Sequence, residues 1–179
     1  SERFKRHFFM LNVPPTDVDS LFRIFHSILS GFLGQFPSEV AASAAKVVKA
    51  SVELYSRVRA EMLPTPSKSH YTFNLRDLSK VVQGVLQTKP GYLADAPELV
   101  SLWAHESMRV FHDRLTCVED RDAFLDLVVA LIRRHFGLRW ETNAVASLMF
   151  GDFMRVGATP EERVYEGVAG GAGSAKVIP

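Results

Sequence analysis

The stretch LPTPSKSHYTFNLRDLSKVVQG, residues 63–84, decides how the rest of the chain is interpreted. A loop with two prolines leads into a helix that we expect to begin after Asn74, with Asp77 three positions on as its capping partner. Arg76 then lies in the first helical turn, where the free N–H groups carry about half a positive charge and favour anions. Asp77 could compensate this cation locally, or Arg76 and the helix start could face a phosphate. The pattern alone leaves both interpretations open.

Apolar residues recur at helical spacing through most of the chain. This periodicity predicts a mainly α protein, with helices over residues 16–34, 38–62, 74–86, 97–116 and 120–136. We expect Thr16 to cap the first helix, Gly34 to end it and Gly137 to end the last one. Five aromatic side chains are interpreted as packing residues of the core: Phe22, Phe25, Phe32, Trp103 and Trp140.

One segment near the start of the chain indicates a strand. Residues 8–13 read FFMLNV, an almost continuous apolar run that is typical of a strand buried on both faces of a parallel sheet. A strand needs backbone partners, and no second convincing strand precedes residue 147. Either the run extends a helix, or its partners lie in sequence outside this chain, and we favour the second interpretation. LMFGDFM, residues 148–154, could form a further short strand.

Composition and charge disfavour several classes of function. Hydrophobic residues make up 47% of the 179 residues and charged residues 23%, as in an ordinary globular protein. Lys and Arg number 21 against 20 acidic residues, so no long-range positive field attracts nucleic acid or an anionic membrane. No apolar run reaches the roughly 18 residues that a membrane span requires. The only cysteine, Cys117, cannot form an internal disulfide, which fits a reducing compartment such as the cytoplasm.

The sequence contains no recognisable catalytic or metal-binding motif. The glycine cluster GVAGGAGSAK does not match a phosphate loop, because two residues separate its last glycine from Lys176. His105 and His112 lie seven positions apart, where the helix of a zinc protease requires four. Cys117 is followed closely by two acidic residues, which disfavour its thiolate. We therefore assign no catalytic nucleophile and no metal ligand.

The same stretches resemble a known family. PTPSKSHYTFNLRDLSKVVQG is similar to the lid of an AAA+ module in dynein heavy chains, and specifically to the third module of the axonemal class. RFKRHFFMLNVPPTDVDSLFRIFHSIL resembles the end of that module's large α/β subdomain, LWAHESMRVFHDRL its later lid helices, and FGDFM the segment leading to the next module. The resemblance extends over residues 1 to about 166. It implies the last β-strand of the large subdomain in 1–15, a small helical lid subdomain in 16–137 and a connection toward the next module in 138–166. Residues 167–179 are expected to form a flexible glycine-rich tail.

The resemblance also implies roles for two arginines. Arg76, in NLRD, matches the sensor-2 position, which reaches from the lid toward the γ-phosphate. Its guanidinium would detect the terminal phosphate and couple the loss of that phosphate to movement of the lid. Arg3, in RFKR, matches the arginine-finger position and would act on the nucleotide of the adjacent module. A structural salt bridge is the alternative for Arg3, and Arg6 takes the finger position if the register is shifted.

The family further implies ATP or ADP with Mg in the complete module, which would be a regulatory ATPase of a microtubule motor in the cytoskeleton of the cilium axoneme. Its partners would be neighbouring AAA+ modules of the same heavy chain and, through the parent motor, the microtubule. This chain carries neither the phosphate-loop lysine nor the Mg-binding aspartate of that pattern. We therefore expect that the chain alone neither hydrolyses ATP nor binds it tightly, and micromolar binding in a calorimetric titration with ATP and Mg would contradict this. The alternative is a nucleotide-independent helical interaction domain that uses its aromatic face to bind a partner.

Overall fold

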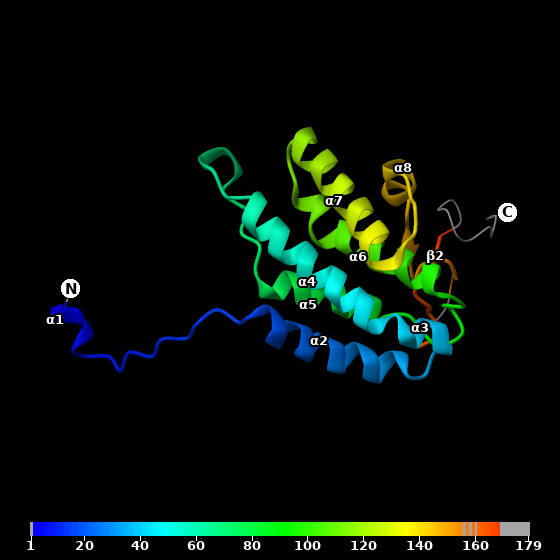
Figure 1. The fold of residues 1–179 in the computed structure, drawn as a ribbon, viewed down its shortest axis with the longest axis horizontal. Coiled ribbons are helices and arrows are strands. Elements are labelled where there is room, and N and C mark those ends of the chain that lie inside the picture. Colours follow the sequence, from blue (N-terminus) through cyan, green and yellow to red (C-terminus); the bar gives the residue numbers. More distant parts are fainter. Residues whose placement is uncertain (1, 156, 158, 160, 169–179) are drawn as a thin grey trace.

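The computed structural model describes residues 2–155, 157, 159 and 161–168. Most of these residues form a bundle of helices (Figure 1). The elements are α1 Glu2–Lys5, α2 Val18–Leu33, α3 Ser38–Ala42, α4 Ala44–Glu61, η1 Pro66–Lys68, α5 Leu75–Val85, α6 Ala96–Val110, η2 His112–Arg114, α7 Val118–Phe136, α8 Thr142–Ala146, β1 Phe150–Gly151 and β2 Glu166–Gly167. The mainly α fold class predicted from the periodicity is confirmed.

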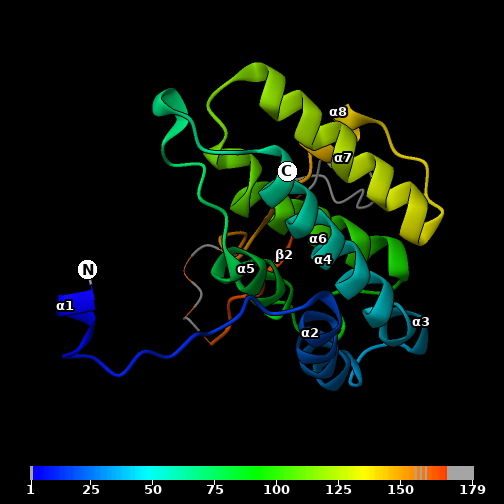
Figure 2. The ribbon, with the colours of Figure 1, turned by 60° about the vertical axis from the view of Figure 1, so that its left-hand side comes forward.

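Helix α4 occupies the centre of the bundle. It packs against α2 and α7, and both views place it between these two helices (Figures 1 and 2). Helices α5 and α6 form a second closely packed pair, and α5 also packs against α4. Trp103 of α6 is fully buried, and its indole N–H donates to Ser51 Oγ of α4 at 2.8 Å. Because a buried indole N–H needs an acceptor, this contact joins α6 to α4 at a defined position.

The five aromatic residues assigned to packing all contact the core. Phe25 and Trp103 are buried within it, and the other three are partly buried against it: Phe22, Phe32 and Trp140. Their interpretation as packing residues is confirmed. The aromatic face of α2 is therefore used mainly inside the bundle rather than offered as a surface for a partner.

The helix ends differ from expectation at one position and agree at two. Thr16 is the expected cap of the first helix, but Asp17 holds that position, and its Oδ2 accepts the N–H of Ser20 at 3.3 Å. Aspartate offers a carboxylate to the positive end of the helix, which stabilises the start at this position. Gly34 ends α2 as predicted. Gly137 ends α7 in the left-handed conformation, at φ 74°, which glycine adopts without strain.

Two of the predicted helices are shorter than the apolar pattern indicates. The helix predicted over 38–62 is interrupted at Ser43, whose hydroxyl donates to the carbonyl of Glu39 at 3.0 Å. At Ser43 the backbone departs from regular helical angles, with φ −83° and ψ −9°, so α3 ends and α4 begins there. The helix predicted over 97–116 ends at Val110 and continues as the turn η2. This turn carries residues that contact the loop before α5.

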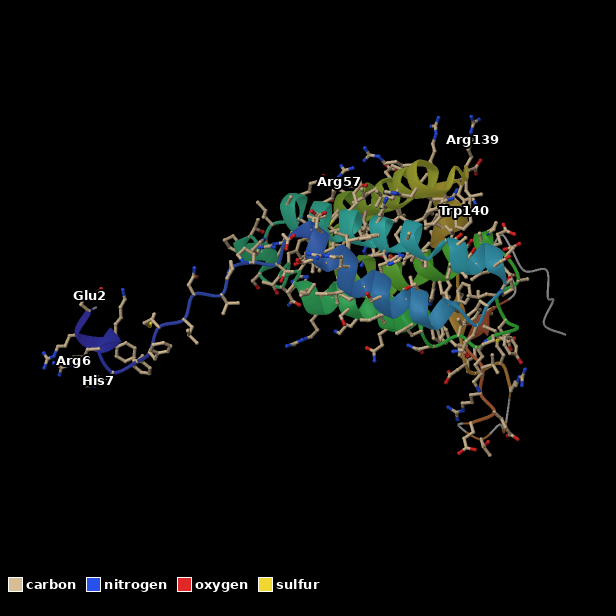
Figure 3. All side chains as sticks on the ribbon, turned by 60° about the horizontal axis from the view of Figure 1, so that its bottom comes forward. Glu2, Arg6, His7, Arg57, Arg139 and Trp140 are labelled. Atoms are coloured by element: carbon tan, nitrogen blue, oxygen red, sulfur yellow. The ribbon has the colours of Figure 1, made fainter. Side chains whose placement is uncertain are left out.

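The strand predicted over residues 8–13 does not form in the structure. RFKR lies mainly in the short helix α1, and the chain then runs irregularly to α2 with apolar side chains exposed, Phe9 at 90%. The segment extends away from the bundle, and Figure 3 shows the side chains of Arg6 and His7 far from it. The described residues contain no strand beside this segment, and an unpaired apolar strand is not stable in water. The assignment of residues 1–15 to a larger subdomain stays a prediction.

The end of the described chain folds back onto the bundle. Strand β1 pairs antiparallel with β2, with Phe150 opposite Gly167, so the possible strand in LMFGDFM finds its partner within this chain. Between the strands, Val164 is buried and the Tyr165 hydroxyl donates to the buried carboxylate of Glu106 on α6. Gly167 therefore belongs to a strand rather than to the predicted glycine-rich tail, and residues 169–179 of that tail lie outside the described residues. The role of 138–166 as a connection stays a prediction.

Candidate functional site at the start of helix α5

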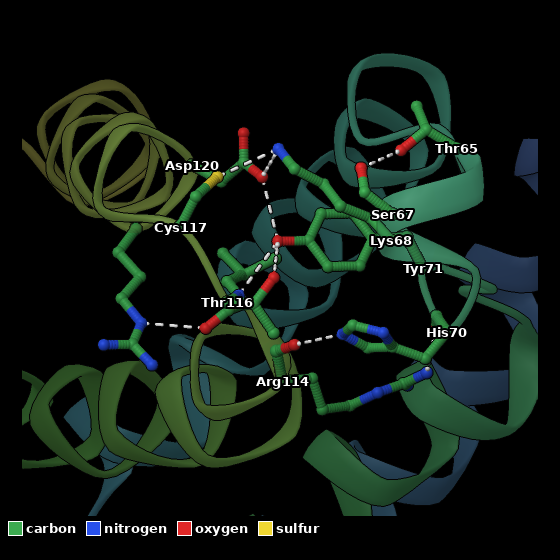
Figure 4. Close-up of polar contacts among 11 residues, drawn as sticks. Thr65, Ser67, Lys68, His70, Tyr71, Arg114, Thr116, Cys117 and Asp120 are labelled. Atoms are coloured by element: carbon green, nitrogen blue, oxygen red, sulfur yellow. Dashed lines mark hydrogen bonds and ion pairs between the residues drawn. The ribbon is translucent and has the colours of Figure 1, made fainter.

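Two buried aromatic side chains fix the loop between α4 and α5. Tyr71 and Phe73 are both buried, at 2% and 8% exposure. The Tyr71 hydroxyl donates to Asp120 Oδ2 at 2.8 Å and accepts the N–H of Thr116 at 3.0 Å (Figure 4). The ring of Phe73 lies 5.8 Å from that of Phe111, centre to centre. These contacts fasten the loop to the turn between α6 and α7 and set the direction in which the chain enters α5.

A charged cluster fixes the outer end of the same loop. Lys68 Nζ lies 2.6 Å from Asp120 Oδ2 and 2.9 Å from Cys117 Sγ (Figure 4). Hydrogen bonds to Asp120 and Cys117 raise the pKa of Lys68 above its ordinary range. Hydrogen bonds from the Cys117 thiol and the Lys68 ammonium lower the pKa of Asp120 to about 2. The acidic surroundings expected for Cys117 thus include a lysine that its local sequence does not reveal.

The lowered pKa of Asp120 predicts a loss of stability in acid. The folded-state pKa is about 2 and the ordinary value is 3.8, so the unfolded chain binds a proton first as the pH falls. The contribution of this carboxylate is complete above pH 3.8 and is lost as the pH falls toward 2. In chemical denaturation at neutral pH, Asp120→Asn should lower the free energy of unfolding by about 1 kcal/mol, since solvent screens this partly exposed pair. Below pH 4, the free energy of unfolding of the variant should also fall by about 1 kcal/mol less than that of the unchanged chain.

Asp122→Asn is the matched control, because Asp122 is exposed on the same helix and forms none of the ion pairs found among the described residues. It should retain the full stability and the full acid dependence. Equal acid dependence of the Asp120 and Asp122 variants would show that the Lys68 cluster does not stabilise the fold.

A second cation, Arg114 of η2, joins the inner end of the loop to α5. Its Nη1 lies 3.0 Å from Asp77 Oδ1, and its Nη2 donates to the carbonyls of His70 and Thr72 at 3.2 and 3.3 Å. The guanidinium carbon lies 4.8 Å from the centre of the Phe73 ring. One planar group therefore contacts a carboxylate, two backbone carbonyls and an aromatic face, which a guanidinium can do and an ammonium cannot.

Helix α5 begins as predicted, and Arg76 lies in its first turn. The Asn74 side chain accepts the N–H of Arg76 at 2.9 Å, and Asp77 Oδ2 accepts the N–H of Asn74 at 2.9 Å, which confirms the capping pair. The Arg76 side chain is exposed, and among the described residues it forms no ion pair or side-chain hydrogen bond. Asp77 pairs with Arg114 and accepts from Asn74 and does not contact Arg76 directly. Both interpretations of Arg76 stay open.

An open pocket of about 250 Å³ lies beside the start of α5. Its wall includes Pro15 before α2, Tyr55 and Arg59 of α4, and Leu75 of α5. Arg76 follows Leu75 directly in the chain, but it is not one of the residues that line the pocket. Apolar and aromatic walls beside the cation Arg59 suit a flat ligand that carries negative charge.

The structure does not bring the other predicted arginines to this site. Arg3 lies in α1 and Arg6 follows it, on the segment that extends from the bundle (Figure 3). Arg6 Nε donates to the neighbouring His7 at 3.2 Å, and the ion pair within α1 joins Lys5 to Glu2 rather than to Arg3. The adjacent module on which Arg3 would act is not part of this chain. The arginine-finger assignments of Arg3 and Arg6 stay predictions.

Sequence reasoning missed Lys68 and Arg114. Lys68 and Asp120 are 52 positions apart, and no local pattern pairs them. The alternation of Tyr71 and Phe73 before the helix cap was the available signal, because two apolar side chains so close to a cap indicate a loop anchored on the core. This alternation would have shown that Tyr71 and Phe73 hold the loop on the core, but it would not have identified Lys68 and Arg114.

The described part of the chain shows neither a metal-binding cluster nor a membrane-spanning helix. None of its His, Cys, Asp and Glu side chains gather in threes or more in a way that could hold a metal ion. Its helices also lack the combination of length and apolar character that crossing a membrane requires.

Residues 24–121 of this helical bundle match the family model of the dynein heavy chain ATPase lid domain. The human dynein axonemal heavy chain 6 is 45% identical over 166 residues, covering 92% of this chain and 4% of that protein. The human dynein axonemal heavy chain 10 is 36% identical over 166 residues, covering 93% and 4%. The mouse dynein axonemal heavy chain 12 is 35% identical over 179 residues, covering 91% and 6%. The chain belongs to the dynein heavy chain family.

The extent of these matches limits what they establish. The chain spans only 4% to 6% of the length of these relatives. The matched lid region, residues 24–121, lies inside the predicted lid subdomain of 16–137. What the match establishes for this chain is therefore an ATPase lid domain.

Proposed function

We propose that this chain is the lid of the third AAA+ module of an axonemal dynein motor, and that it senses the nucleotide bound by that module. Arg76 is the sensing residue in this proposal. The observation that carries it is the exposed guanidinium of Arg76 in the first turn of a capped helix, where it has no partner among the described residues. A cation at the positive end of a helix is unfavourable unless an anion lies nearby, and a terminal phosphate supplies that anion.

The residues around the pocket fit a nucleotide. Tyr55, Pro15 and Leu75 offer apolar surface for a base. Arg76, in the first turn of α5, offers a planar set of donors for a phosphate. ATP or ADP with Mg would be held mainly by the remainder of the module, and the metal would neutralise charge on the phosphates. This chain contributes a cation whose contact with the terminal phosphate exists before hydrolysis and is lost afterwards. Loss of that contact would release the lid.

The remaining assignments complete the proposal. Residues 1–15 would become a strand only when the sheet of the large subdomain lies beside them, which accounts for the exposed apolar side chains of 8–13. Arg3, or Arg6 in a shifted register, would then be held near the nucleotide of the adjacent module. The partners are neighbouring AAA+ modules and, through the complete motor, the microtubule. The axonemal relatives indicate a location in the cytoskeleton of the cilium axoneme.

The test is the preference of the module for ATP over ADP. In the intact heavy chain, with the phosphate loops of the other modules inactivated, Arg76→Ala should reduce the ratio of ATP to ADP affinity by about tenfold, since a charge-assisted hydrogen bond is lost only from the ATP state. Competition of each nucleotide with a fluorescent analogue measures the ratio. Thermal stability should not change, because the Arg76 side chain is exposed and unpaired among the described residues.

Lys80→Ala is the matched control, because Lys80 is an exposed cation one turn further along α5. It should leave the ratio unchanged. An unchanged ratio in the Arg76 variant would contradict nucleotide sensing and would favour a nucleotide-independent interaction domain. The burial of the aromatic face of α2 does not favour that alternative.

A further inference from the structure

We propose that Arg114 is a positioning residue for Arg76: it holds the start of α5 against the turn between α6 and α7, and so determines where the Arg76 guanidinium points. This inference rests on the proposed function. Arg114 contacts α5 through Asp77 in the same helical turn as Arg76, and it reaches the site from η2. Three observations support the inference.

The first observation is the double role of Asp77. Its Oδ2 accepts the N–H of Asn74 and so closes the cap of α5, while its Oδ1 pairs with Arg114 Nη1 at 3.0 Å. The Asp77 side chain is 7% exposed, and that of Arg114 is 33% exposed. A buried carboxylate is stable only when it is paired, so removal of Arg114 would force Asp77 to turn toward water. The cap that aligns the first turn would be weakened together with the ion pair.

The second observation is that the same guanidinium holds the loop before the helix. Arg114 Nη2 donates to the carbonyls of His70 and Thr72, and in the opposite direction the ring of His70 contacts the carbonyl of Arg114 at 3.0 Å. Contacts in both directions fix the loop relative to η2. The chain therefore enters α5 at an angle that Arg114 and the loop determine together.

The third observation is that Arg114 lies on η2, the turn between the long helices α6 and α7. Turn η2 packs against both α6 and α7, so any rotation of these helices would move Arg114. Through Asp77 that movement reaches the turn that carries Arg76. Movement of the lid helices and the position of the Arg76 guanidinium are thus coupled through the packing of η2, the ion pair of Arg114 with Asp77 and the backbone of α5.

The experiment compares single and double variants in the intact heavy chain, with the phosphate loops of the other modules inactivated. ATP and ADP affinities are measured by competition with a fluorescent nucleotide. Arg114→Gln should reduce the ratio of ATP to ADP affinity by about threefold to tenfold. In the Arg76→Ala background the same change should have no further effect on the ratio, because Arg114 acts through Arg76.

Arg121→Gln is the matched control. Its Nε donates to the carbonyl of Leu115 at 2.8 Å, so it supports the same turn, and it forms no contact with α5 among the bonds of the described residues. It should leave the ratio unchanged. If Arg114→Gln prevents folding, Arg114→Lys replaces it: it keeps a charge beside Asp77 but loses the fork that reaches the carbonyls, and it should reduce the ratio to a smaller extent.

The outcomes separate the inference from the proposed function. If Arg76→Ala lowers the ratio and neither Arg114 variant does, the positioning role is wrong and nucleotide sensing stands. If an Arg114 variant lowers the ratio equally with and without Arg76, Arg114 has only a structural role and the inference is wrong. If Arg76→Ala has no effect, both proposals are overturned.

Discussion

Replacement of Gly84 by alanine is expected to lower the free energy of unfolding by about 3 kcal/mol. Helices α5 and α6 approach closely at this glycine. An added Cβ would overlap Oε2 of Glu106 and lie 2.6 Å from its Cγ, which is far inside van der Waals contact. Glu106 cannot move away without cost, because it is buried and accepts a hydrogen bond from Tyr165. Urea denaturation of the chain at neutral pH measures the effect.

A second glycine provides the matched control for this prediction. Gly31 lies in helix α2, and an added Cβ there meets no atom within 4 Å. Gly31→Ala should raise the free energy of unfolding by up to about 1 kcal/mol, because alanine is the better helix former. If both variants change the free energy of unfolding by the same amount, the inference that α6 leaves no space for a Cβ at Gly84 is wrong.

The clash can also be removed from the other helix. In a Glu106→Ala background, the methyl group that Gly84→Ala adds would occupy space that the carboxylate has vacated. The cost of Gly84→Ala should then fall to about zero, so that the double variant is more stable than the sum of the single changes predicts. Additive costs would show that Gly84 is required for a reason other than its contact with Glu106.

Much of the fold could be predicted because it depends on local chemistry. The apolar spacing located the main helices, and the capping pair of Asn74 and Asp77 located the start of α5. Gly137 ended α7 for a reason visible in the sequence, its freedom to adopt positive φ. Arg76 could be chosen for the same reason, because a cation in the first turn of a helix is a local anomaly.

The remaining features depend on contacts between distant parts of the chain. The run at 8–13 has the composition of a strand, but strand formation requires a neighbour, and the described chain provides none. The charges of Lys68 and Arg114 are visible in the sequence, but their partners depend on how α6 and α7 pack against the loop before α5. The need for Gly84 likewise appears only when α6 is in place.

The other large effect is expected at Trp103, where replacement by alanine should lower the free energy of unfolding by about 4 kcal/mol. Trp103 is fully buried, its ring lies 6.0 Å from that of Phe136 on α7, and its indole N–H donates to Ser51 on α4. One side chain therefore joins three helices. Its removal leaves a cavity at their junction, and the midpoint of urea denaturation should fall accordingly.

Two comparisons separate the packing of Trp103 from its hydrogen bond. Ser51→Ala keeps the indole but removes its acceptor, and it should cost about 1 to 3 kcal/mol because a buried donor loses its partner. Trp140→Ala should cost less than Trp103→Ala, since Trp140 is only partly buried against the core. Because a domain of this size has a total stability of about 5–15 kcal/mol, the Trp103 variant should still fold but unfold at a clearly lower denaturant concentration. Equal midpoints for the Trp103 and Trp140 variants would mean that the junction of α4, α6 and α7 is not the centre of the core.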